Sequence, residues 1–314
     1  DYYASRGLGD VYKRQIIYIS LFILMLTHPV IVLSGAKQGI SLWIESVVPS
    51  LLPYMILSNF LIYAGISADT AIIMKPAARL LKLPDDAAYC ILAGLLFGYP
   101  ACAVSAVSLY REGRIDKNAA AFLSCCFNNI SPAFIAGFVC AGILKNTSMI
   151  APVLILFYII ILLSTIIIKF TFFRGSYVDC TPSVPESGHS GNFFDMAVIN
   201  SLTNIARLAG YIIVFSIAAN LVLQIPMPCA PFICAVMEVT TGLNALADSI
   251  KNMHILLLLI IPALAFGGIS GIFQTFGVDT DNVINRRKYI LSKLITMAVA
   301  FVCTYLFMII FKIQ

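Results

Sequence analysis

Residues 118–144, NAAAFLSCCFNNISPAFIAGFVCAGIL, decide the fold predicted for this chain. The stretch is apolar enough and long enough to cross a bilayer. Its middle carries Asn128, Asn129, Ser131 and Pro132, which a lipid-facing helix does not need. Such a break is tolerated only where protein or a water-filled cavity surrounds it, and interrupted helices form the midplane substrate sites of secondary transporters. The sequence therefore predicts a membrane transporter with a broken helix at its centre.

A comparable interruption lies in the second half of the chain, at residues 265–276, AFGGISGIFQTF. Gly267 and Gly268 open it, and Ser270 and Gln274 follow with polar side chains. Glycines at such a place allow either an unwound turn that faces a ligand or close packing of helices through small residues. Two interrupted segments in corresponding positions indicate a transporter built from two related halves.

The composition places the chain among helical membrane proteins. Of its 314 residues, 60% are hydrophobic and 11% are charged, with a mean hydropathy of +0.95. Soluble domains carry about 25% charged residues. The apolar runs are continuous and lack the alternation, over about ten residues, of membrane β-strands. The net charge of +5 comes from Lys and Arg in short loops, which is typical of orientation signals and not of nucleic-acid binding.

Chemistry-bearing motifs are sparse. Nine cysteines and three histidines are scattered without metal-ligand spacing, so we expect no metal and no other cofactor. No nucleophile, base and carboxylate constellation and no phosphate-binding loop stands out. We therefore expect no enzymatic activity.

The predicted fold is an all-α polytopic membrane protein made of two inverted repeats. Residues 1–15 read as a non-native N-terminal scar, and 16–34 as an extra transmembrane helix. The first repeat covers 35–173, a polar linker covers 174–192, and the second repeat covers 193–314. Each repeat reads as an interfacial helix, spanning helices, and broken or re-entrant helices between them.

Charge asymmetry decides which segments cross the membrane. If all nine apolar segments span, Lys and Arg divide almost evenly between the two sides. If the third and seventh segments are re-entrant hairpins, which turn at Gly98-Tyr99-Pro100 and at 238–242, 16 of the 20 basic residues fall on the inside. This arrangement also gives the two repeats opposite orientations, and we predict it.

Five local motifs, taken in order, resemble one family. They are WIESVVPSLLP at 43–53, GYP at 98–100 with LYREG at 109–113, CFNNISP at 126–132, MEVTTG at 237–242 and FGGIS at 266–270. Their order and spacing are similar to those of the YlbJ-type sporulation integral membrane proteins, which carry the nucleoside-recognition or gate domain. The resemblance covers the chain from about residue 36 onward.

The resemblance implies movement of dipicolinate, a small aromatic dicarboxylate, across a membrane around the developing spore. It implies a multi-pass protein of the plasma (inner) membrane of an endospore-forming bacterium. The chain departs from the family after Pro100. There the family carries a Gly-Ala-Lys run, and here stand Ala101, Cys102 and Ala103, without a basic residue.

Ser131 and Pro132 form a helix-start signal. A helix that starts in mid-membrane points free N–H groups and a partial positive charge towards a bound anion. Asn128 and Asn129 add groups for a carboxylate or a pyridine nitrogen; the alternative is a kink in which these side chains bond to neighbouring helices. The predicted substrate-binding residues are Gly98, Tyr99, Pro100, Asn128, Asn129, Ser131, Pro132, Thr240, Thr241, Gly267, Gly268, Ser270 and Gln274.

Glu238 is the predicted site of proton or ion coupling. It is the one acidic residue deep in an apolar segment. A charge there costs about 2.5 kcal/mol or more, and such residues usually mark an ion or proton path. The alternative is a protonated Glu238 that bonds to neighbouring backbone and holds the hairpin in place.

The leading functional hypothesis is a secondary transporter for a small organic anion, with dipicolinate favoured by the resemblance. Uptake of a nucleoside or nucleobase is a second hypothesis, because the gate domain is shared. A non-transporting accessory protein of spore formation is a third, although a scaffold has no need of the paired breaks. The expected partners are the small anion, the lipid bilayer and, as an open possibility, further copies of the chain in a homo-oligomer, but not nucleic acid.

Overall fold

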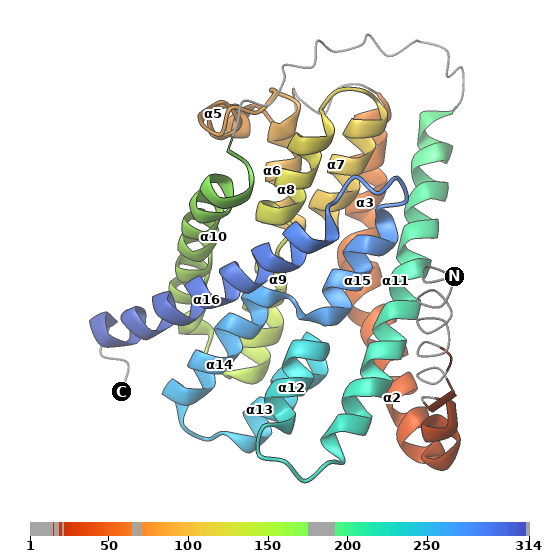
Figure 1. Cartoon of the computed structure of the whole chain (residues 1–314), viewed down its shortest axis with the longest axis vertical. Helices are drawn as coiled ribbons and strands as arrows, with labels where there is room; N and C mark the ends of the chain where they lie inside the picture. The colour runs from red at the N-terminus through yellow and green to blue at the C-terminus, as the bar shows by residue number, and fades with distance from the viewer. Residues whose placement is uncertain are drawn as a thin grey trace, which may run out of the picture.

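The structure is a computed structural model that describes residues 22–64, 71–174 and 192–311, together with residues 15, 19, 20 and 69. The described residues are mostly helical and contain no strand (Figure 1). Five helical stretches are long and apolar enough to cross a membrane, namely Lys117–Ile143, Thr147–Phe172, Phe193–Leu223, Met253–Val278 and Arg286–Ile310. The chain is therefore an all-α, multi-pass membrane protein, as predicted. The expected scar and linker fall almost entirely outside the described residues.

The helices form two sets whose main elements follow the same order, with additional short helices in the first set (Figure 1). The first set is α2 (Pro29–Leu42), η1 (Trp43–Val47), α3 (Val48–Tyr63), η2 (Ile72–Met74), α5 (Lys75–Leu80), α6 (Ala87–Phe97), α7 (Ala101–Arg111), α8 (Lys117–Phe127), α9 (Pro132–Phe134), η3 (Ile135–Ile143), η4 (Thr147–Met149) and α10 (Ile150–Phe172). The second set is α11 (Phe193–Leu223), α12 (Ala230–Met237), α13 (Val239–Ser249), α14 (Met253–Phe266), α15 (Gly268–Val278) and α16 (Arg286–Phe311). Each set runs from a long helical rod through a hairpin and a broken helix to a final long helix.

The opening rod of each set differs from the expected segmentation. In the first set α2, the π-helical turn η1 and α3 follow one another without a loop, so the boundary expected at residue 34 falls inside α2. In the second set α11 is one helix of 31 residues. Gly35 and Gly39 let the two rods approach closely, since a Cβ built on Gly35 would lie 2.7 Å from the Cα of Ile217. The expected interfacial helix is thus part of a packed rod.

The third and seventh segments form helix hairpins. The legs α6, α7 and α13 have 11 residues each and α12 has 8. At 1.5 Å per residue these legs are about 12–17 Å long, too short for a hydrocarbon core of about 30 Å. The legs pack side by side, because a Cβ built on Gly94 would lie 2.9 Å from the Cβ of Cys102 and one on Gly242 would lie 2.0 Å from the N of Ala235. The two hairpins lie at opposite ends of the molecule (Figure 1), which agrees with the re-entrant, inverted arrangement predicted.

Both predicted helix breaks are confirmed. After α8 the helix resumes at Pro132, and the hydroxyl oxygen of Ser131 caps it by accepting a hydrogen bond from the N–H of Phe134 at 3.2 Å. Between α14 and α15 the chain turns at Gly267, whose φ of +81° lies in the left-handed region that favours glycine.

Basic side chains gather at the end of the molecule where α6 begins and α7 ends. There Lys169 Nζ donates a hydrogen bond to the carbonyl of Leu81 at 2.8 Å, and Lys288 Nζ donates to that of Phe172 at 3.2 Å. We call this end, formed by residues 75–86, 111–117, 169–174 and 279–288, the basic end. Its composition fits the predicted inside face.

Candidate substrate-binding site

The tips of the two hairpins meet at the break between α14 and α15. The ring of Tyr99, at the α6–α7 tip, packs over two glycines: a Cβ built on Gly271 would lie 3.1 Å from the ring, and one on Gly267 would lie 3.5 Å from it. A Cβ built on Gly268 would lie 3.1 Å from Cγ2 of Val239, at the α12–α13 tip. These glycines therefore have the close-packing role that was one of the two alternatives.

The α6–α7 tip also touches the start of α9. Gly98 has φ +80° and ψ −166°, and a Cβ built on it would lie 2.5 Å from the backbone nitrogen of Ser131. This backbone region is essentially restricted to glycine. Gly98, Pro100 and Pro132 shape the backbone here, and none of them lines the cavity described next.

A cavity of about 260 Å³ lies where these elements meet, and we call it the central cavity. Its lining is Leu42, Val47, Phe97, Tyr99, Ile130, Ser131, Ala133, Phe134, Phe138, Ile212, Glu238, Thr240 and Gln274. Five of the predicted site residues are thus brought together from four separate segments: Tyr99, Ser131, Glu238, Thr240 and Gln274. Apolar and aromatic walls with a few polar groups are typical of small-molecule sites.

Glu238 caps the N-terminus of α13 and lines the cavity. Its Oε1 accepts a hydrogen bond from the N–H of Thr240 at 3.1 Å, and its Oε2 accepts one from the N–H of Thr241 at 2.7 Å. Only 5% of Glu238 is exposed. Each carboxylate oxygen can accept a further hydrogen bond, so the anchored side chain still offers acceptors to the cavity. The structure thus shows the backbone hydrogen bonds expected if Glu238 holds the hairpin in place, and also the position beside a cavity expected if it is a coupling site.

The remaining polar candidates lie beside Glu238 and on α15. Gln274 lines the cavity, and its Nε2 donates to the hydroxyl of Ser270 at 3.0 Å, which orients the amide. Ser270 is buried and outside the cavity lining. Thr241 is also buried outside the lining, and its hydroxyl has no hydrogen-bond partner.

Asn128 and Asn129 do not line the central cavity. Asn128 Nδ2 donates to the hydroxyls of Thr275, at 2.8 Å, and Tyr289, at 3.0 Å. Asn129 Nδ2 donates to the carbonyl of Cys126 at 2.7 Å. Both asparagines are buried. The structure thus matches the alternative in which these side chains bond to neighbouring helices, because the polar partners on α15 and α16 are already in place.

Lys293 completes this buried network, and sequence reasoning missed it. Its Nζ donates to the carbonyl of Asn128 and to Oδ1 of Asn129, at 3.0 Å to the latter, and lies 5.5 Å from the centre of the Tyr289 ring. Only 2% of Lys293 is exposed. It is therefore a buried residue of α16 and not a loop charge, although it was included among the 16 basic residues assigned to the inside. The sequence held the signal, because Lys293 interrupts an apolar helix as Glu238 interrupts an apolar segment.

The charges near the break are therefore distributed differently from expectation. The chain lacks the basic residue that the resembling family carries after Pro100, and the buried ammonium near the break comes from Lys293 of α16. The lining of the central cavity itself contains Glu238 and no Lys or Arg among the described residues. Within the described part of the chain, no three His, Cys, Asp or Glu side chains come together as metal ligands.

Comparison with known proteins finds similarity to a sporulation protein. The chain is 24% identical over 331 aligned positions to the sporulation integral membrane protein YlbJ of Bacillus subtilis (strain 168), and the match covers 90% of this chain and 80% of that protein. No protein-family profile matches the chain. No solved structure matches it. The resemblance drawn from the five motifs is confirmed by this match.

Proposed function

We propose that this YlbJ-like, multi-pass membrane protein is a secondary transporter that moves a small organic anion across a membrane during sporulation. The observation that carries the proposal is the central cavity, which lies between two hairpins from opposite ends of the molecule. Substrate sites at the interface of inverted repeats are typical of secondary transporters. Dipicolinate is the favoured substrate, because the resemblance implies it and a flat aromatic acid suits walls that contain Phe97, Phe134 and Phe138.

Movement of the hairpins against the α14–α15 break supplies alternating access. Tyr99 packs against Gly271, and Val239 packs against Gly268, so both hairpin tips contact the first turn of α15. A movement of this turn therefore alters the contacts of both tips at once. Rocking of one repeat against the other around a fixed site is the usual scheme for such folds.

Glu238 couples transport to protons in this proposal. It is the ionisable carboxylate of the cavity lining. Two negative charges that share one site repel each other, so in this proposal a proton enters together with the carboxylate anion. The proton leaves with the substrate on the other side. The same residue that caps α13 thus links substrate occupancy to the hairpin tip.

Transport by the purified protein in lipid vesicles tests the proposal. Wild-type protein is expected to accumulate labelled dipicolinate when a pH gradient is imposed. Glu238→Gln is expected to exchange labelled for unlabelled dipicolinate but to lose pH-driven accumulation, because glutamine can still accept a hydrogen bond from α13 but cannot titrate. Retained exchange also shows that the variant is folded.

Glu45→Gln is the matched control, since Glu45 is an exposed acid outside the cavity. It should behave as wild type. Accumulation by Glu238→Gln that still follows the pH gradient would overturn the coupling role. Vesicles of wild-type protein that move no dipicolinate would overturn the anion substrate.

A nucleoside or nucleobase is a second candidate substrate, favoured by one observation. The charged group of the lining is the acid Glu238, and the other polar groups come from neutral side chains. A neutral base offers N–H donors to such acceptors and a flat face to phenylalanine rings. Labelled uridine in the same vesicles separates the two candidates, because uptake of uridine without dipicolinate would favour the base.

A further inference from the structure

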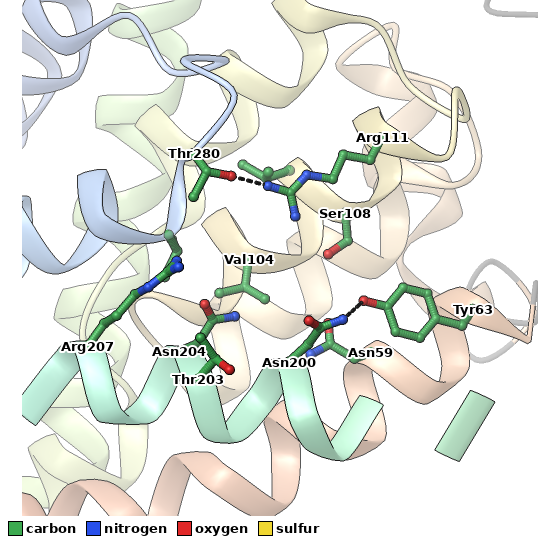
Figure 2. A pocket seen from close by; sticks show the side chains of 12 residues that line it. Asn59, Tyr63, Val104, Ser108, Arg111, Asn200, Thr203, Asn204, Arg207 and Thr280 are labelled. Carbon is green, nitrogen blue, oxygen red and sulfur yellow. Dashed lines mark hydrogen bonds between the residues drawn. The ribbon is translucent and has the colours of Figure 1, made fainter. Parts of the chain in front are cut away.

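A second cavity, of about 150 Å³, lies at the basic end among α3, α7, α11 and the loop after α15 (Figure 2). We call it the arginine cavity, after Arg111 and Arg207, which are the charged residues of its lining. Asn200 and Asn204 of α11 add amide groups beside them. The cavity is therefore polar, unlike the central cavity, and lies at the predicted inside face.

Both guanidinium groups have partners in the segment at the end of α15. Arg111 donates a hydrogen bond to the hydroxyl of Thr280 (Figure 2). Arg111 also donates to the carboxylate of Asp281, and Arg207 Nη1 donates to the carbonyl of Gly277 at 3.4 Å. Asp281 itself is not part of the lining, and no acidic side chain is among the described residues that line the cavity. A concave site lined by charges of one sign concentrates counter-ions.

Neighbouring side chains fix the amides of this cavity. Asn200 Nδ2 donates to the hydroxyl of Tyr63 at 2.7 Å (Figure 2). Asn59 Nδ2 donates to the hydroxyl of Ser201 at 3.0 Å. Asn59 is almost fully buried, at 1% exposure. The amides of Asn59 and Asn200 are thus oriented before any ligand arrives, which lowers the entropy cost of binding.

The arginine cavity and the central cavity follow one another along α11. Arg207 lines the first and Ile212 lines the second, little more than one helical turn apart. Tyr211 lies between them in the helix, and its ring packs on Gly277, where a Cβ would lie 2.6 Å from a ring carbon. The contact between Tyr211 and Gly277 thus lies between the two cavities along α11.

We propose that the arginine cavity is an anion-binding site at the basic-end mouth of the transport route, and that it takes a carboxylate before the central cavity does. A carboxylate binds a guanidinium through two parallel hydrogen bonds, so it can replace Asp281 as the partner of Arg111. This exchange releases α7, in the first repeat, from the loop after α15, in the second, and opens this end as the anion arrives. The anion site itself is independent of the proposed function. Its place on a transport route, and the identity of the bound anion with the transported one, rest on the proposed function.

Charge-selective thiol labelling tests the site without measuring transport. Thr203, an exposed residue of the lining, is replaced by cysteine in a full-length chain whose nine native cysteines have been replaced. Labelling rates are measured with the anionic sulfonatoethyl and the cationic trimethylammonium-ethyl methanethiosulfonates, each normalised to its rate with free cysteine. We expect the anionic reagent to be preferred about tenfold.

Four variants in this background test whether the arginines cause the preference for the anionic reagent. Arg111→Gln and Arg207→Gln should each lower this preference several-fold. Asp281→Asn should raise it, because the carboxylate that competes for Arg111 is gone. Arg79→Gln is the matched control, since Arg79 is also an exposed arginine paired with an aspartate at the basic end, but outside the cavity, and should leave the preference unchanged.

Equal normalised labelling rates for the anionic and cationic reagents would overturn the site. So would a preference for the anionic reagent that neither Arg111→Gln nor Arg207→Gln reduces. Added dipicolinate is expected to slow labelling by both reagents in the parent background and not in Arg207→Gln. Absent protection would overturn the identity of the bound anion with the proposed substrate. If wild-type vesicles move no dipicolinate while the arginine-dependent preference persists, the anion site stands and the proposed function fails.

Discussion

The ammonium nitrogen of Lys293 lies 3.0 Å from the amide oxygen of Asn129, and this hydrogen bond joins the last helix of the second repeat to the central break of the first. The same nitrogen donates to the carbonyl of Asn128, directly after the end of α8. Helix C-terminal ends carry unpaired carbonyls and a partial negative charge, both of which suit a cation. Lys293 therefore stabilises the break from outside the broken helix.

We expect Lys293→Met and Asn129→Ala each to lower the thermal unfolding temperature of the purified protein. Each change leaves a buried polar group without a partner, at a cost of about 1–3 kcal/mol. The double variant should lose less than the sum of the single losses, with a coupling energy of roughly 0.5–3 kcal/mol. Lys251→Met, at an exposed lysine, serves as the control. Strictly additive losses would show that the hydrogen bond does not stabilise the break.

Gly98→Ala is expected to destabilise the protein strongly, because alanine meets both an unfavourable backbone conformation and the backbone nitrogen of Ser131 at 2.5 Å. The conformational part alone costs on the order of 1–3 kcal/mol. Gly210→Ala is the matched control, since a Cβ at this helical glycine has nothing within 4 Å. It should be neutral or stabilising by up to about 1 kcal/mol. Thermal unfolding in detergent measures both, and equal melting temperatures for the two variants would contradict the tight contact at the hairpin tip.

The loops that carry Arg79, Arg114 and Arg287 are predicted to face the cytoplasm. Arg114 itself is buried and paired with Asp86, so an exposed neighbour is the better probe. A cysteine at Lys117 should react with an impermeant thiol reagent only after the cells are opened. A cysteine at Lys145, at the opposite end, should react in intact cells. The reverse pattern would invert the topology, and labelling of both from one side would rule out the hairpin arrangement.

The Arg111 guanidinium, through its hydrogen bond to the carboxylate, holds the pKa of Asp281 below its usual range. A carboxyl group whose pKa is lower in the folded protein contributes stability above its unfolded pKa of about 3.9 and loses that contribution as pH falls through the folded value. The stability difference between wild type and Asp281→Asn should therefore be constant from about pH 7 to pH 5 and shrink below about pH 4. Asp248→Asn, at an exposed aspartate of α13, is the control. A difference that does not change with pH would argue against the Arg111–Asp281 pair.

The sequence by itself determined the class of the protein and the places where its helices break. Ser131 and Pro132 are residues favoured at the N-cap and the first position of a helix, and Gly267 ends a helix in a left-handed turn. These signals act on near neighbours along the chain. The lengths of the hairpin legs follow in the same way from the positions of Gly98 and Glu238.

Only the tertiary structure decided which polar groups face a cavity and which face one another. Asn129 and Lys293 are 164 positions apart, and nothing local links them. Asn128 and Gln274 are both amide side chains in apolar segments, so the sequence does not distinguish them. In the structure Asn128 bonds to residues of α15 and α16, whereas Gln274 lines the central cavity. In a membrane core every buried polar group has to find a partner within the protein, and the packing of distant helices determines that partner.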